Sequence, residues 1–129
     1  MKNILNVEQC KELAKFIPMD KADMVWVSIY DENHLMSDYR IELIPYRFYS
    51  GIGVPCWSLS SLFDYLMEID FFPEIITDRD PGTVYMYADY FDESEGKLVH
   101  PVKTINVNAK TFIDCCYAYI MKLKETNCI

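Results

Sequence analysis

The spacing of apolar residues predicts three amphipathic helices. In the first, over Val7–Ile17, apolar residues recur every three or four positions, Asn6 is a suitable N-cap, and Pro18 ends the helix. A second helix begins after Ser58, and a third follows Asn108 as its N-cap. The apolar stripe of the second comprises Leu59, Leu62, Phe63, Leu66 and Ile69. That of the third comprises Phe112, Cys115, Cys116, Tyr119, Ile120 and Leu123.

Apolar residues also flank the starts of the second and third helices. Trp57 directly precedes the proposed cap Ser58, and Leu62 lies four residues after it. Val107 and Phe112 have the same spacing around Asn108. Such pairs are typical of a hydrophobic staple, so we expect Trp57 to be buried.

Alternation of apolar and polar residues predicts five strands. Their ranges are Met24–Tyr30, Tyr39–Tyr49, Glu74–Thr77, Thr83–Phe91 and Leu98–Val107. In the second of these the phase changes beside Pro45, which cannot donate to a ladder and indicates a bulge or an edge. The segment Ser50–Pro55 is predicted to be a loop, and its Gly-x-Gly lacks the third glycine and the lysine of phosphate-binding loops.

The predicted elements follow the order α-β-β-α-β-β-β-α. The connections between strands are short, which favours antiparallel pairing. Helices that are apolar on one side cover one face of such a sheet. We therefore expect a single α+β domain over residues 1–129, a two-layer sandwich with a mostly antiparallel sheet of about five strands and its helices on one face.

Length and composition are those of a globular protein. The chain has 129 residues, of which 51% are hydrophobic, enough for one core. No apolar run approaches the roughly 20 residues that span a bilayer, and no signal-peptide pattern is present, so we expect a cytoplasmic protein. The five cysteines are odd in number and form no C-x-x-C pair, which argues against a disulfide framework and a zinc site. We expect no metal and no cofactor.

The charge is strongly acidic and unevenly distributed. A net charge of −8 disfavours binding to duplex nucleic acid or to an anionic membrane. Residues 64–95 carry ten acidic side chains and one basic side chain. Because the strand Thr83–Phe91 spans about 30 Å, the acidic residues at its two ends form an extended face and not a compact cluster.

Two interpretations of this acidic segment remain open. It is either a solvated face that maintains solubility or a docking face for a basic protein partner. For the chain as a whole, self-association is the alternative to a basic protein partner. Tyrosines among carboxylates suit protein recognition. The candidate contact residues are Tyr85, Tyr87, Asp89, Asp92, Glu93 and Glu95.

Two other classes of function compete with protein binding. A small enzyme would use Cys56, before a helix start, with His100 and a carboxylate such as Asp89, or a carboxylate pair. The candidate pairs are Asp78 with Asp80 and Asp89 with Asp92. An acidic mimic of nucleic acid would instead require carboxylates spaced like backbone phosphates.

One segment carries a resemblance. The run Ile52-Gly-Val-Pro-Cys-Trp-Ser-Leu-Ser-Ser-Leu62, a proline-led step into an amphipathic helix, precedes a tyrosine-rich strand pair and a C-terminal helix. Over residues 44–125 this arrangement resembles small uncharacterised α+β proteins of bacterial genomes and their phages or mobile elements. The resemblance implies no assigned reaction and therefore no catalytic residues. We expect a small non-enzymatic protein that acts through protein contacts.

Overall fold

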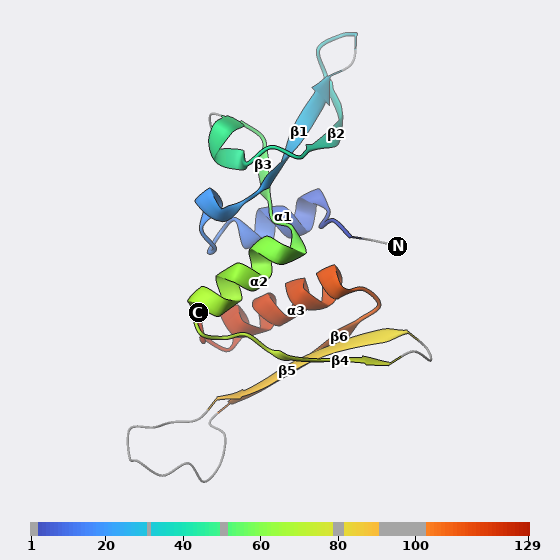
Figure 1. Ribbon diagram of the computed structural model, residues 1–129. Coiled ribbons are helices and arrows are strands. Elements are labelled where there is room, and N and C mark those ends of the chain that lie inside the picture. The colour runs from blue at the N-terminus through green and yellow to red at the C-terminus, as the bar shows by residue number, and fades with distance from the viewer. Residues whose placement is uncertain (1–2, 31, 50–51, 79–81, 91–102) are drawn as a thin grey trace. The chain divides into compact units, whose positions relative to one another are not determined.

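The described residues form three α-helices and two three-stranded antiparallel sheets, an α+β structure (Figure 1). The computed structural model describes residues 3–30, 32–49, 52–78, 82–90 and 103–129. They fall into two compact units, an N-terminal unit up to Tyr65 and a C-terminal unit from Leu66 onward. The sheet of about five strands expected from the sequence is replaced by two smaller sheets, one in each unit.

The N-terminal unit contains the first sheet, in which the strand order is β2-β1-β3. Its elements are α1 (Val7–Leu13), β1 (Met24–Tyr30), β2 (Met36–Glu42) and β3 (Val54–Cys56), with short 3-10 helices η1 (Met19–Lys21) and η2 (Tyr46–Tyr49). Both neighbours of β1 run antiparallel to it. The helix α2 (Leu59–Glu68) follows β3 and continues into the C-terminal unit.

The first helix begins as predicted and ends earlier. The Asn6 side chain accepts a hydrogen bond from the Gln9 backbone N–H at 2.8 Å, and the Gln9 side chain accepts one from the Asn6 backbone N–H, which completes a capping box. The helix ends at Leu13 and not at Ile17. After Leu13 the chain continues in tighter turns, in which the Lys15 N–H donates to the Glu12 carbonyl oxygen and the Phe16 N–H to that of Leu13. Pro18 follows these turns and disfavours helical backbone at Ile17.

The segment predicted as the loop Ser50–Pro55 contributes a strand. Val54–Cys56 pairs with β1, and Val25 lies opposite Pro55. Gly53 has a φ of +93°, and a Cβ atom there would lie 2.5 Å from the Trp26 carbonyl oxygen. Glycine thus permits both the turn and the close approach to β1. Pro55 is tolerated because β3 is at the edge of the sheet.

The second predicted strand is displaced. The strand occupies Met36–Glu42 in place of Tyr39–Tyr49, and a register shift opposite Ile29 and Tyr30 marks a bulge near its start. Beyond it, Tyr46–Tyr49 form η2. Pro45 directly precedes η2, which is consistent with the preference of proline for turns and helix starts. The phase change in the sequence therefore marks the end of the strand.

The C-terminal unit contains the second sheet, in which the order is β4-β5-β6. Its elements are β4 (Glu74–Asp78), β5 (Thr83–Tyr90), β6 (Lys103–Ala109) and α3 (Phe112–Glu125). The long helix α3 packs on β5 and β6 (Figure 1). The Cys115 thiol donates to the Val84 carbonyl oxygen at 3.3 Å. One face of the sheet is thereby covered.

The cap of α3 differs from the prediction. Thr111 is the N-cap, and its side-chain oxygen accepts a hydrogen bond from the Asp114 backbone N–H at 3.2 Å. Asn108, the predicted cap, lies within β6 opposite Tyr85. The strand continues to Ala109 because its pairing with β5 extends further than the local sequence indicates.

Each unit has a core of fully buried apolar side chains. In the N-terminal unit these include Leu5, Leu13, Val25, Trp57 and Leu62, and in the C-terminal unit Met86, Ile105, Ile113, Tyr119, Ile120 and Leu123. The predicted burial of Trp57 is confirmed. None of the helices in the described part of the chain combines the length and apolar character needed to cross a bilayer.

Candidate functional site

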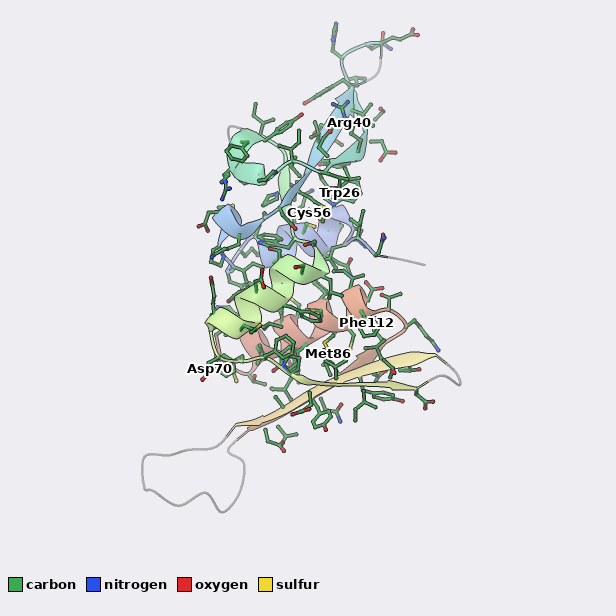
Figure 2. The ribbon with its side chains drawn as sticks, in the orientation of Figure 1. Trp26, Arg40, Cys56, Asp70, Met86 and Phe112 are labelled. Carbon is green, nitrogen blue, oxygen red and sulfur yellow. The ribbon has the colours of Figure 1, made fainter. Side chains whose placement is uncertain are left out.

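The C-terminal sheet has one face that α3 does not cover. Alternate residues of a strand point to opposite faces, and paired residues share a face. Val84, Met86 and Ile105 are buried on the α3 side, where Figure 2 shows Met86 between β5 and the helix. We call the other side the open sheet face. We define it by its nine exposed or half-buried residues, which are Glu74, Ile76, Asp78, Tyr85, Tyr87, Asp89, Thr104, Asn106 and Asn108. Thr83, which lies opposite Asp78 on the same side, is buried.

The two tyrosines occupy the centre of the open sheet face. Tyr87 lies between Glu74 and Asn106 in the register, and Tyr85 lies between Ile76 and Asn108. Paired residues in neighbouring antiparallel strands have Cβ atoms about 5 Å apart, so these side chains form two continuous rows across the sheet. Both tyrosines are half-buried, whereas Ile76 is 50% exposed.

The charge of the open sheet face is uniformly negative. Glu74, Asp78 and Asp89 are exposed carboxylates, and the nine residues of the face include no lysine, arginine or histidine. The Asp89 carboxylate accepts a hydrogen bond from the Thr104 hydroxyl at 2.9 Å, which orients it on the face. A tyrosine pair surrounded by carboxylates offers aromatic surface and hydrogen-bond acceptors to a positively charged molecule.

Three of the six predicted contact residues lie together on the open sheet face. They are Tyr85, Tyr87 and Asp89. The other three, Asp92, Glu93 and Glu95, lie outside the described residues. Sequence reasoning missed Glu74, Ile76, Asn106 and Asn108, which belong to the neighbouring strands. Alternation within each strand was visible, but the register that joins the strands was not.

The nucleophile considered from the sequence lies in an unfavourable environment for catalysis. The Cys56 side chain is fully buried at the end of β3. A hydrogen bond with the Cys10 thiol, and then burial, raise the pKa of the Cys56 thiol far above its usual range. Because the thiolate is the nucleophile, this environment suppresses its reactivity. Asp89 belongs to the other unit, and His100 lies outside the described residues.

The carboxylate pairs proposed from the sequence are only partly described. Asp78 ends β4 and Asp89 lies in β5, whereas Asp80 and Asp92 lie outside the described residues. Within the described ranges, no three His, Cys, Asp or Glu side chains are grouped so as to hold a metal ion. All five cysteines are free thiols, and four of them are buried.

Comparison with protein-family models, curated proteins and solved structures finds no match for this chain. The function of this chain is therefore inferred from the residues of the open sheet face.

Proposed function

We propose that this is a small non-enzymatic protein that acts through protein–protein contacts, with the open sheet face as its surface for a basic partner. The observation that carries the proposal is the half-buried Tyr85–Tyr87 centre with three exposed carboxylates and, among the nine described residues of the open sheet face, no lysine, arginine or histidine. Tyrosine supplies contact area at low entropic cost, and the carboxylates select cationic side chains.

The dimensions of the face favour a short segment of a partner. Three strands about 4.8 Å apart and five residues long, at about 3.3 Å each, give roughly 14 Å by 17 Å in plan. Stable complexes between folded domains bury about 800 Å² per partner, which is several times this plan area. The occupant we infer is therefore an extended basic segment that places lysine or arginine beside Glu74, Asp78 and Asp89.

The spacing of the carboxylates does not favour mimicry of nucleic acid. Glu74 and Asp78 are four residues apart along β4, a separation of about 13 Å. Each strand of duplex DNA carries a phosphate about every 3.4 Å along the helix axis. The open sheet face is therefore much less densely charged than the surface that a mimic would reproduce.

A labelled peptide of alternating lysine and threonine provides the test. We expect it to bind the protein at low salt and to dissociate as salt rises, because exposed charges are screened beyond about 8 Å at physiological ionic strength. The variant Glu74→Lys/Asp78→Lys/Asp89→Lys should weaken binding by about tenfold or more, the effect of losing roughly 1.4 kcal/mol. Fluorescence anisotropy measures the affinity.

A matched variant separates a specific face from net charge. Asp20→Lys/Glu32→Lys/Asp64→Lys changes the net charge equally at exposed positions outside the open sheet face. It should bind far better than the open-face variant, while Tyr85→Ala/Tyr87→Ala should bind weakly although its charge is unchanged. If both charge variants lose the same affinity for the peptide and Tyr85→Ala/Tyr87→Ala loses none, then only the overall charge of the protein attracts the peptide.

A further inference from the structure

The N-terminal unit presents a second surface, the outer edge of strand β2. Within the described residues, β2 pairs with one neighbour, β1, and all of its side chains are exposed or half-buried. An edge strand carries a row of backbone N–H and C=O groups that can pair with a further strand. Figure 1 shows β1 and β2 as an extended hairpin.

The hydrogen bonds of β2 show which backbone groups face outward. The Tyr39 backbone N–H donates to its neighbour's side chain, Asp38 Oδ1, at 2.8 Å. We therefore take the Tyr39 N–H to point away from β1. Because successive residues of a strand alternate in the direction of these groups, those of Ile41 point outward as well. Asp38 and Arg40 then direct their backbone groups toward β1, where they lie opposite Ile29 and Val27.

The charged side chains of β2 are complementary to those of β2 in a second copy that runs antiparallel to it. If two copies pair antiparallel with Tyr39 opposite Tyr39, then Asp38 of each copy lies opposite Arg40 of the other. Because the backbone groups of Tyr39 point outward, this register also forms reciprocal backbone hydrogen bonds between the two Tyr39 residues. Asp38 and Arg40 are both exposed, and they share one face of the strand.

The present contacts of Asp38 and Arg40 allow both side chains to form ion pairs with a second copy. Arg40 Nε donates to Glu42 Oε1 at 2.7 Å, and this hydrogen bond is the main cause that raises the pKa of Arg40. Its other guanidinium N–H groups can bind a second carboxylate. In the antiparallel pair, the Tyr39 N–H donates to the Tyr39 carbonyl oxygen of the second copy and no longer to Asp38. The Asp38 carboxylate then binds Arg40 of that copy.

We propose that two copies of this chain associate through β2, in an antiparallel pair centred on Tyr39 and held by two Asp38–Arg40 ion pairs. The partner is a second copy because Asp38 and Arg40 lie on either side of Tyr39, so an antiparallel copy of the same strand places opposite charges against each other. Such self-complementarity is what an isologous interface requires. This interface is independent of the open sheet face, so the peptide experiment and the test below can fail separately.

Charge reversal tests the register directly. Sedimentation velocity should show the wild-type protein passing from monomer to dimer between about 1 µM and about 1 mM, the range of weak specific association. In a dimer of Asp38→Arg, each introduced arginine lies opposite Arg40 of the other copy. In a dimer of Arg40→Asp, each introduced aspartate lies opposite Asp38 of the other copy. Each variant alone should dimerise at least about tenfold more weakly, because opposed like charges replace attractive pairs.

The mixture of the two variants is the decisive sample. The arginine introduced by Asp38→Arg then lies opposite the aspartate introduced by Arg40→Asp. The native Arg40 of the first variant lies opposite the native Asp38 of the second, so an equimolar mixture should form a heterodimer of wild-type affinity. The heterodimer also proves that both variants are folded. The control Glu32→Lys makes the same charge change as Asp38→Arg in the loop beside β2, and it should dimerise normally.

Three results would overturn the proposal. They are a wild-type protein that stays monomeric throughout the concentration range, single variants that dimerise as well as the wild type, and a mixture of folded variants that gains no dimer. Circular dichroism establishes the folded state of each variant. If one variant is unfolded, Asp38→Arg/Arg40→Asp replaces the mixture, since it restores both ion pairs within its own dimer.

Discussion

Trp57 illustrates how much of the N-terminal unit depends on a single side chain. Its ring is fully buried, and its indole N–H donates to the Pro18 carbonyl oxygen at 3.3 Å, 39 residues away in the sequence. It thereby joins the segment after α1 to the start of α2. Beside it, Ser58 caps α2, because its side-chain oxygen accepts the Ser61 N–H at 3.1 Å, and its hydroxyl donates to Asp23.

We predict that Trp57→Ala lowers the free energy of unfolding by about 3–5 kcal/mol, the cost of leaving a large cavity in a core. Trp57→Phe should cost less, since it keeps most of the apolar volume and loses the hydrogen bond. Urea denaturation followed by circular dichroism measures both changes. An unchanged midpoint for Trp57→Ala would mean that the ring is exposed in solution and free to serve as a binding residue.

At the scale of elements, the start of α3 is decided by strand pairing and not by local sequence preference alone. Asn108 lies within β6, and Thr111 is the N-cap. Thr111 and Asn108 are both good caps by residue type. Thr111→Ala should cost about 1 kcal/mol, because the Asp114 N–H loses its acceptor. Asn108→Ala is the matched control and should change stability by about 0.5 kcal/mol or less, as expected for an exposed strand position. The reverse order of the two denaturation midpoints would place the helix start at Asn108.

The elements that could be predicted are those whose signals are local. The capping box at Asn6, the burial of Trp57 and the alternation in β1 and β5 depend on residues within a few positions of each other. The strand β3 could not be predicted, because it exists through the close approach of Gly53 to Trp26, which lies 27 positions earlier. The division into two sheets follows from that pairing, since β3 completes the sheet of β1 and β2.

The candidate site shows the same division. Tyr85, Tyr87 and Asp89 could be found from alternation within one strand. Their neighbours Glu74 and Asn106 required the register between strands, which short-range patterns do not specify when both faces of a strand carry suitable residues. The acidic composition of the segment indicated a charged surface, but only the pairing places three carboxylates on one side of one sheet.

At the scale of the whole molecule, buried thiols in both units make stability depend on pH. A hydrogen bond with Cys10, and then burial, raise the pKa of Cys56 in the N-terminal unit. In the C-terminal unit, burial raises the pKa of Cys115, and burial followed by the proximity of Cys115 raises the pKa of Cys116 to about 12. An unfolded thiol titrates near pH 8.5. Each raised pKa therefore contributes stability that is fully present below about pH 8.5 and is lost as the pH rises toward the folded-state value.

The free energy of unfolding should accordingly fall between pH 7 and pH 10, because above about pH 8.5 the unfolded chain releases thiol protons that the folded protein retains. Each such thiol contributes a slope of up to about 1.4 kcal/mol per pH unit. Cys116→Ala should make the decline shallower. Ser60→Ala, at an exposed position of α2, removes no thiol and should keep the wild-type slope. Urea denaturation at several pH values gives the slope of the free energy of unfolding against pH for each protein. A loss of packing that is the same at every pH shifts the free energy but leaves this slope unchanged. Identical slopes in all three proteins would show that the Cys116 thiol titrates in the folded protein as it does in the unfolded chain.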